Sequence, residues 1–180
     1  MENYKSPSES WVSITQLMLP SHSNFGGKVH GGHILNLMDQ IAFACASKHS
    51  LCYCVTASVN RVDFLSPIEV GELVTLRASI NYTGRTSMVV GVRVDAQNIT
   101  EGTTRHCNSS YFTMVAQDAQ GNSVPVPGLL VENEQGVRRF ARSRQRKEEA
   151  FSRDTQFDAS QFKIGEHLGR LKKENIKIDL

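Results

Sequence analysis

The chain has 180 residues, a formal net charge of +2 and 39% hydrophobic residues. This composition is sufficient for a packed core and excludes a wholly disordered chain, and near-neutral charge gives no case for a nucleic-acid partner. No run approaches the roughly 18 consecutive apolar residues of a membrane span, and the polar start MENYKSPSES lacks the apolar region of a secretory signal. We therefore expect a cytoplasmic protein with reduced cysteines and no membrane partner.

Charge divides the chain into two regions. Residues 1–130 carry a net charge of −1, whereas residues 131–180 carry +3 and contain the basic run from Arg138 to Lys147. We predict an N-terminal tail at residues 1–9, a globular domain at 10–130, and a charged helix and tail at 131–180. Composition predicts helix from Glu134 to Phe151. Residues 152–180 are expected either to form a short second helix near 158–173 or to be disordered without a partner.

The predicted domain contains a strand, a helix and then four strands. Alternating apolar residues after Trp11 predict an edge strand ending at Pro20, and a glycine-rich loop covers residues 23–32. Apolar residues recur at helical spacing from His33 to His49 and surround nearly the whole helix, so we expect it to be buried. Turn signals then separate four β-rich runs, at residues 54–64, 73–82, 86–97 and 104–117. Short connections favour antiparallel pairing, so the predicted class is α+β, with one sheet against one long helix.

Asp39 lies in the middle of this apolar helix, between Met38 and Ile41. An unpaired buried carboxylate costs several kcal/mol, so proteins rarely keep one without a use. A local cap or ion pair is the alternative, but Lys48 is nine residues away and no basic residue lies within one turn. We therefore predict a functional carboxylate at Asp39.

Asn24 lies in the glycine-rich loop that leads into the same helix. The loop glycines permit positive φ and close approach of a ligand to the backbone. Gly31 and Gly32 lie at the helix start, where N–H groups are free and the helix dipole is positive, which favours binding of an oxyanion. A flexible loop that merely turns the chain is the alternative interpretation.

A series of short motifs occurs in order along residues 10–150. They are Asn24-x-x-Gly27-x-x-His30-Gly31-Gly32, Met38-Asp39, Val55-Thr56, Phe64-Leu65-Ser66-Pro67, Gly84-Arg85-Thr86-Ser87-Met88, Phe112-Thr113-Met114-Val115-Ala116 and Val124-Pro125-Val126-Pro127-Gly128-Leu129. Each motif alone is weak, but the ordered set resembles the acyl-CoA thioesterases of the hotdog fold, in particular the YciA-like and brain-type cytosolic acyl-CoA hydrolases. The resemblance implies a long central helix wrapped by an antiparallel sheet, in agreement with the residue patterns.

The resemblance also implies the activity and the assembly. Acyl-CoA would be hydrolysed to free fatty acid and CoA, with coenzyme A as part of the substrate and no other cofactor. The enzyme would be a homodimer, commonly within a trimer of dimers, in which Asn24 and Asp39 of different chains meet. Asp39 would activate a water or attack directly, and Asn24 would orient the water or polarise the thioester carbonyl. The Gly32 N–H would receive the oxyanion, with Thr56 as a helper near the water.

The resemblance places coenzyme A at the turn Arg85-Thr86-Ser87. Arg85 would pair with a CoA phosphate, while Thr86 and Ser87 would hydrogen-bond pantetheine or adenine groups. An ordinary hairpin turn is the alternative. The basic run after residue 137 is either a solvated helix face or a contact to CoA phosphates or a neighbouring subunit; the resembling enzymes often have an arginine-rich helix at this place.

Two other functions are weighed against hydrolysis. A hotdog hydroxyacyl-thioester dehydratase would use His30 as its catalytic histidine, whereas a non-catalytic CoA or acyl-CoA sensor would keep Arg85 without needing Asp39. In the thioesterase, His30 and Gly31 would lie near the site. His22, His30 and His33 give no fixed tetrahedral ligand set, so we expect no metal. Acyl chain length and nucleotide regulation do not follow from the sequence.

Overall fold

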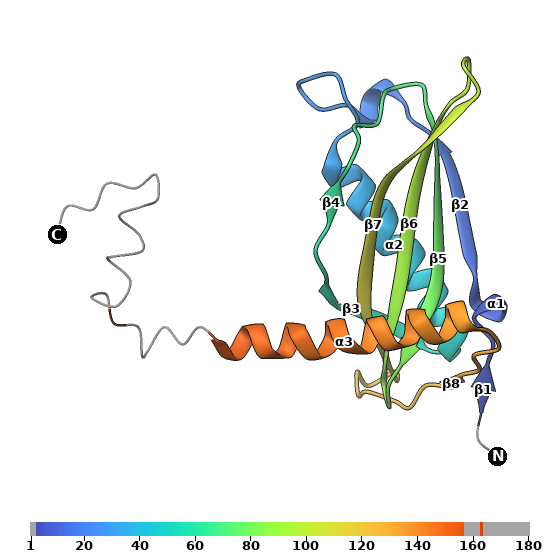
Figure 1. The fold of residues 1–180 in the computed structure, drawn as a ribbon, viewed down its shortest axis with the longest axis vertical. Coiled ribbons are helices and arrows are strands. Elements are labelled where there is room, and N and C mark those ends of the chain that lie inside the picture. The colour runs from blue at the N-terminus through green and yellow to red at the C-terminus, as the bar shows by residue number, and fades with distance from the viewer. Residues whose placement is uncertain (1–2, 157–162, 164–180) are drawn as a thin grey trace. The chain divides into compact units, whose positions relative to one another are not determined.

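The structure is a computed structural model that describes residues 3–156 and residue 163 (Figure 1). The chain divides into two compact units, Met1–Ser143 and Arg144–Leu180. The helix predicted from Glu134 is confirmed as α3, Glu134–Gln156. The second helix predicted near residues 158–173 lies outside the described residues, apart from the single position 163.

One antiparallel sheet forms the body of the first unit. Its strand order is β2 (Val12–Leu17), β5 (Leu73–Thr83), β6 (Ser87–Asn98), β7 (Thr103–Gln117) and β3 (Tyr53–Val59). The short strand β4 (Asp63–Phe64) also pairs with β7. The predicted edge strand and β-rich runs are confirmed, except that the run at 54–64 forms two strands, β3 and β4. Consecutive hairpins place β5, β6 and β7 side by side, whereas β2 and β3 complete the two edges.

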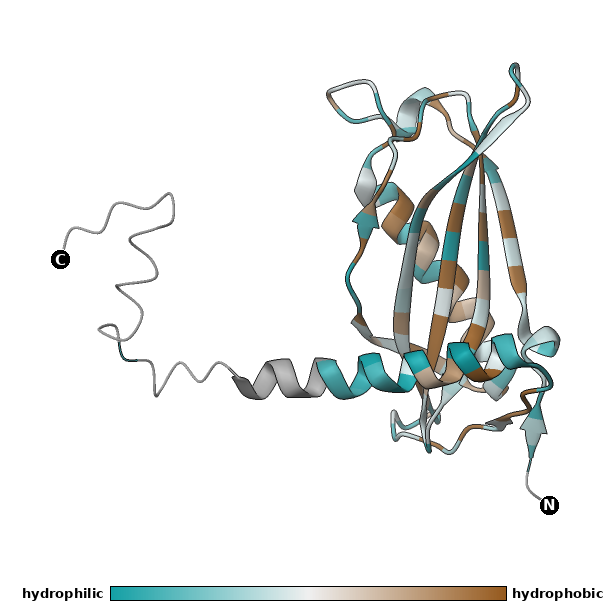
Figure 2. Cartoon of the chain, in the orientation of Figure 1, coloured by the Kyte–Doolittle hydropathy of each residue, from teal (hydrophilic) through white to brown (hydrophobic). Residues whose placement is uncertain are grey.

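Helix α2 (Gly31–Ser50) lies against one face of this sheet, and the strands curve around it (Figure 1). Its buried side chains, including Met38, Ile41 and Cys45, pack into one core with inward residues such as Leu76 and Phe112. The strands alternate apolar and polar residues, which Figure 2 shows as alternating brown and teal bands. The predicted α+β class, with one sheet around one long helix, is confirmed.

The prediction that α2 is buried on nearly all sides is wrong for the single chain. Asn36, Gln40 and Phe43 lie on an exposed side of the helix. Phe43, 38% exposed, meets the ring of Tyr53 on β3 edge-to-face, with 5.7 Å between the ring centroids. Among the described strands, β3 pairs only with β7, so its other edge is unpaired. The neighbouring side of α2 is also left uncovered.

The N-terminal tail predicted at residues 1–9 contains two short elements. Strand β1 (Tyr4–Lys5) pairs in parallel with β8 (Gly128–Leu129), and α1 (Pro7–Ser10) follows it. The Lys5 Nζ donates a hydrogen bond to the His49 carbonyl at 2.7 Å. The buried His49 ring lies 3.2 Å from Ser10 Oγ and 3.3 Å from the Pro127 carbonyl oxygen. These contacts attach the N-terminal elements to the end of α2, and burial lowers the pKa of His49.

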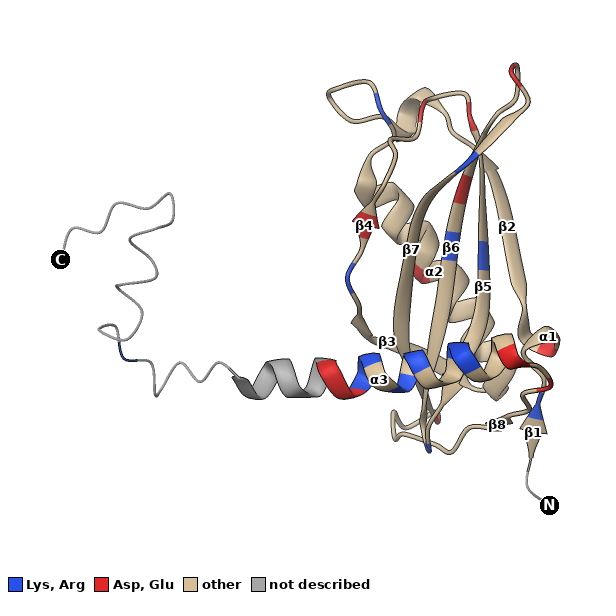
Figure 3. Cartoon of the chain, in the orientation of Figure 1, with Lys and Arg blue, Asp and Glu red and all other residues tan. Residues whose placement is uncertain are grey.

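Two charged clusters lie on the sheet (Figure 3). Asp95 is 7% exposed and accepts hydrogen bonds from Arg77 and Arg93. Glu72 is 4% exposed and pairs with both terminal nitrogens of Arg105. Burial alone would raise the pKa of Glu72, but the Arg105 guanidinium holds it below its ordinary value. Charge pairing therefore compensates for the desolvation of both carboxylates.

Within the part of the chain that the structure describes, none of the helices has both the length and the apolar character needed to cross a membrane.

Candidate active site

The start of α2 is shaped by one histidine and two glycines. His30 is the N-cap residue, and its Nδ1 accepts a hydrogen bond from the Gly32 N–H at 2.9 Å. A Cβ at Gly32 would lie 2.9 Å from the His30 ring, and one at Gly31 would lie 3.2 Å from the Phe64 ring. The prediction that the Gly32 N–H is free is wrong for the single chain, because the His30 side chain caps it.

The loop before α2 holds Asn24 by its side-chain oxygen. Asn24 Oδ1 accepts hydrogen bonds from the Gly26 N–H at 2.9 Å and the Lys28 N–H at 3.2 Å. The Asn24 N–H donates to the Lys28 carbonyl at 2.7 Å, and Gly27 completes the turn with φ of +77°. Because Oδ1 accepts both bonds, the NH2 group of the exposed Asn24 side chain is the part left to donate a hydrogen bond. The loop is therefore internally braced.

Asp39 lies at the boundary between the buried and uncovered sides of α2. It is half-buried, and not fully buried as predicted, because the sheet covers only one side of the helix. Thr56 of β3 donates a hydrogen bond from Oγ1 to Asp39 Oδ1 at 2.6 Å. A β-bulge between Thr56 and Ser58 shifts the pairing of β3 with β7 beside this contact. The structure thus brings the predicted carboxylate and threonine together, and Asp39 Oδ2 stays outside their hydrogen bond.

Asn24 and Asp39 of the same chain are separated along the axis of α2. Asp39 is eight residues beyond Gly31, which places it about 12 Å along the helix axis at 1.5 Å per residue. Asn24 precedes the first turn of the helix, and no hydrogen bond joins it to Asp39 within the described residues. The structure therefore does not bring these two predicted residues together in one chain.

The predicted coenzyme A turn lies at the other end of the sheet from the Asn24 loop. The turn joins the end of β5 to β6, whereas the loop follows Met18, whose N–H donates to the Glu72 carbonyl at the start of β5. The 11 residues of β5 span about 36 Å, so one chain separates the two features by most of the sheet (Figure 1).

The backbone of this turn is fixed, while its arginine is exposed. The Arg85 carbonyl accepts a hydrogen bond from the Val126 N–H at 3.0 Å, and the Thr86 carbonyl accepts one from the Ala116 N–H at 3.1 Å. The Arg85 side chain is exposed, whereas Thr86 and Ser87 are half-buried. The arrangement holds a guanidinium at a rigid tip, where it can reach an anionic group.

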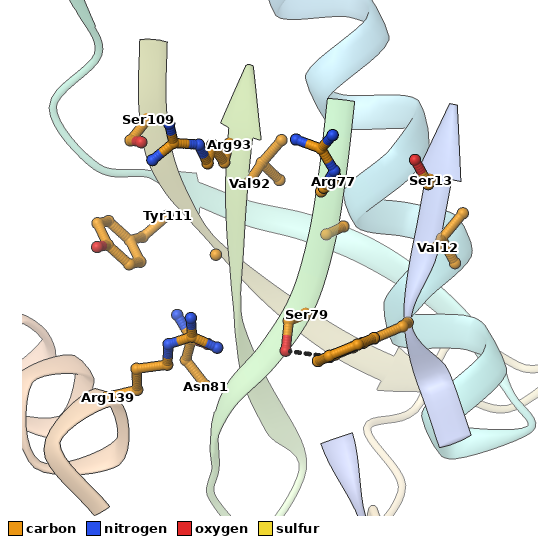
Figure 4. A pocket seen from close by; sticks show the side chains of 13 residues that line it. Val12, Ser13, Arg77, Ser79, Asn81, Val92, Arg93, Ser109, Tyr111 and Arg139 are labelled. Carbon is orange, nitrogen blue, oxygen red and sulfur yellow. Dashed lines mark hydrogen bonds between the residues drawn. The ribbon is translucent and has the colours of Figure 1, made fainter. Parts of the chain in front are cut away.

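A cavity of about 520 Å³ opens on the outer face of the sheet (Figure 4). Arg77 and Arg93 point into it from the strands, and Arg139 reaches it from the first part of α3. Ser79 also lines it and accepts a hydrogen bond from Trp11 Nε1 at 3.0 Å. None of the predicted site residues lines this cavity. The sequence feature that could have indicated this cavity is the alternation of polar residues with core residues along β5.

The described residues contain no group of three or more His, Cys, Asp or Glu side chains that could hold a metal ion. Two of the histidines near the Asn24 loop stack on each other instead. The ring centroids of His22 and His33 are 3.9 Å apart, and the planes are 16° from parallel.

Comparison with known proteins identifies the family. The model of the thioesterase superfamily matches residues 26–103. The protein VdlD of Helicobacter pylori is 41% identical over 135 residues, which are 75% of this chain and 77% of that protein. The uncharacterized acyl-CoA thioester hydrolase YkhA of Bacillus subtilis is 34% identical over 72% of this chain and 75% of its own length. The chain belongs to the thioesterase superfamily. Human cytosolic acyl coenzyme A thioester hydrolase is 35% identical over 74% of this chain and 36% of its own length.

Solved structures of the thioesterase superfamily share the fold. An apo-hexameric acyl-CoA thioesterase has a TM-score of 0.83 and 35% identity, covering 86% of this chain and 99% of its own. A Staphylococcus aureus acyl-CoA hydrolase in complex with butyryl coenzyme A, coenzyme A and coenzyme A disulfide has a TM-score of 0.78 and 32% identity, covering 84% and 93%. Three further structures of that hydrolase replace an asparagine, an aspartate and a threonine by alanine, at positions separated by 15 and 17 residues.

In this member of the thioesterase superfamily, the sequence patterns did not predict that the His30 side chain caps α2. A histidine directly before Gly31 and Gly32, at the start of a helical pattern, was the available signal. Sequence patterns place His30 beside the helix, but its ring position depends on the loop geometry that the structure supplies.

Proposed function

We propose that this chain hydrolyses acyl-CoA to a free fatty acid and CoA. The observation that carries the proposal is the hydrogen-bonded pair of Asp39 and Thr56 on the uncovered side of α2. Asn24, Asp39 and Thr56 are separated by 15 and 17 residues, as are the asparagine, aspartate and threonine replaced in the Staphylococcus aureus hydrolase. We assign catalysis to the domain at residues 10–130, with residues 131–180 as an extension.

In the proposed reaction, Asp39 is the general base. The Thr56 hydroxyl holds Oδ1, so Oδ2 accepts a proton from water as the water oxygen attacks the thioester carbonyl carbon. The resulting tetrahedral intermediate then breaks its carbon–sulfur bond. CoA leaves as a thiolate that takes the proton back from Asp39, which restores the carboxylate, and the acyl group leaves as a carboxylic acid. A thioester needs no strong acid for this step, because a thiolate is a good leaving group.

Asn24 would polarise the thioester carbonyl in this proposal. Its Oδ1 is occupied by two backbone N–H groups, so its NH2 group is the part available to substrate. A donor of this kind stabilises the negative charge that develops on the carbonyl oxygen. The Gly32 N–H would add a second donor only after the His30 ring releases it.

The site would be built by two copies of the chain. A two-fold axis that places two α2 helices antiparallel moves the Asn24 end of one chain towards the middle of its partner's helix. Phe25, Phe43 and Tyr53 are 112%, 38% and 62% exposed, which supports their burial in such an interface. Burying one such side chain contributes about 1.5–3 kcal/mol. The unpaired edge of β3 would join the two sheets, and the hexameric relative supports a trimer of these dimers.

Coenzyme A would bind at Arg85, Thr86 and Ser87. The exposed Arg85 guanidinium suits a phosphate group, and the two hydroxyl side chains suit the polar atoms of pantetheine or adenine. The coenzyme A complexes of the Staphylococcus aureus hydrolase support this ligand class. The human relative, which is named as cytosolic, supports a cytoplasmic location.

The test is thiol release from acyl-CoAs of increasing chain length by the purified full chain. We expect turnover by the wild type and a loss of about 10²–10⁴-fold in Asp39→Ala. Asp63→Asn is the matched control, because Asp63 is an exposed carboxylate on β4 whose ion-pair partner is Arg61. Wild-type turnover in Asp39→Ala would refute the mechanism. Absence of thiol release from every acyl-CoA would refute the function.

A further inference from the structure

The two stacked histidines lie at the base of the Asn24 loop. His22 ends the short helix η1 (Pro20–His22), and His33 lies in the first turn of α2. Their ring centroids are 3.9 Å apart. Beside the stack, the His30 N–H donates to the His22 carbonyl at 2.8 Å. The ring stack and this hydrogen bond together close the loop that carries Asn24.

The contacts of the stack suit two neutral rings. His22 Nδ1 accepts a hydrogen bond from the Leu19 N–H at 3.2 Å, which requires a lone pair on that nitrogen. His33 Nε2 is buried without a hydrogen-bond partner among the described residues. Burial, and next the neighbouring His22, lower the pKa of His33. Two protonated rings at this separation would repel each other.

The neighbouring charged groups leave the stack without a compensating acid. Lys28, on the far side of the loop, forms an ion pair with Glu69. His30 Nδ1 is occupied by the Gly32 N–H. No carboxylate forms an ion pair with either stacked histidine in the described part of the chain. Protonation is therefore expected to open the stack, because no ion pair offsets the repulsion.

We propose that His22 and His33 are positioning residues, whose neutral stack holds the loop so that Asn24 donates to the substrate. This proposal rests on the proposed function of Asn24. Neither ring touches the reacting atoms in this scheme, since both act through the loop backbone. Acidification separates the rings, and the Asn24 amide loses its fixed position. The expected kinetic result is a fall in kcat at acidic pH with a smaller change in KM.

The first test compares pH profiles of the wild type and His33→Phe. The phenylalanine keeps a ring in the stack, does not titrate, and removes no hydrogen bond of His33 Nε2. We expect wild-type kcat to fall several-fold, by less than about tenfold, from about pH 7.5 to about pH 5.5, because the pKa of His33 is lowered, and that of His33→Phe to change by less than about twofold. His33→Ala removes the ring and should lower kcat at both pH values. An identical fall of kcat at acidic pH (the acid limb of the pH profile) in the wild type and His33→Phe would overturn the proposal.

A matched control uses a histidine elsewhere on the sheet. His106 lies 3.2 Å from Asp95 Oδ1 in the charged cluster on the sheet, and His106→Gln removes one titratable ring without touching the stack. We expect His106→Gln to keep the acid limb of the wild type. Loss of that limb in His106→Gln would contradict the assignment to His22 and His33.

The second test does not depend on activity. The Gly26 and Lys28 amides donate to Asn24 Oδ1, so their hydrogen exchange reports whether the loop is closed. At about pH 5.5 we expect faster exchange in the wild type than in His33→Phe, and similar exchange at about pH 7.5. An inactive protein with this exchange pattern would refute the proposed function alone. An active protein with equal exchange in both variants would refute the role of the stack alone.

Discussion

Two inactive variants should restore activity to each other when they pair. Asn24 precedes α2 and Asp39 lies about 12 Å along it, so a two-chain site takes one residue from each chain. A heterodimer of Asn24→Ala with Asp39→Ala then contains one site with both residues intact and one site with neither. Random pairing of equal amounts makes about half the dimers heterodimers, so about a quarter of all sites recover.

The assay is thiol release from acyl-CoA by variants that carry different affinity tags and are expressed together. We expect about a quarter of wild-type activity in the mixture, against about 1% or less for each variant alone. The control is an equal mixture of the wild type with the double variant of Asn24 and Asp39. In that mixture a two-chain site leaves about a quarter of wild-type activity, whereas a one-chain site leaves about half. A purified heterodimer with no recovered activity would refute the shared site.

Three further predictions concern binding and stability. Arg85→Ala should raise KM for acyl-CoA about tenfold in steady-state assays while kcat changes less, because a phosphate contact is lost; an equal rise in Arg61→Ala, whose arginine is exposed and pairs with Asp63, would contradict this. Arg105→Met should lower the free energy of unfolding in urea by about 3–5 kcal/mol, because it leaves buried Glu72 unpaired; Glu72→Gln added to it should recover much of the loss, and no recovery would contradict the pairing argument. Burial keeps the pKa of His49 below 6.5 in the folded state, so the unfolded chain takes up the proton first, and the free energy of unfolding should fall as pH drops below about 6.5. His49→Gln should reduce this pH dependence, measured by urea unfolding at about pH 7.5 and about pH 5.5. An unchanged pH dependence would exclude His49 as a cause.

Local patterns were sufficient for the long helix and the long strands of the fold, but not for β1, α1 or the division of the run at 54–64 into β3 and β4. Turn signals around the β-rich run at 73–82 predicted a strand there, and the structure has β5 at Leu73–Thr83 with its buried residues in the core beside α2. The start of α2 was placed two residues late, because the cap at His30 depends on a side chain that folds back onto Gly32. The order of the residues alone does not predict that hydrogen bond.

The burial of Asp39 was overestimated for a different reason. Apolar neighbours along a helix predict that a helix is covered, but they do not say which sides one chain covers. Phe43 is exposed because its cover would have to come from outside the described chain. The contact of Asp39 with Thr56 joins a helix to a strand, so only the family resemblance placed these residues near each other. The stack of His22 and His33 depends in the same way on tertiary structure.

The position of β2 at one edge of the sheet has a consequence for the order of folding. Val12 pairs with Ala78, 66 residues later, whereas Thr83 pairs with Met88 across a short turn. Loop-closure entropy makes the distant pairing slow, so we expect the β5–β6–β7 meander to form first and β2 to join late. Until then the edge of β5 and the part of the core that Val12 and Ile14 cover remain open to other unfolded chains. Refolding yield should therefore fall as protein concentration rises, because intermolecular association competes with the closure of a single edge strand.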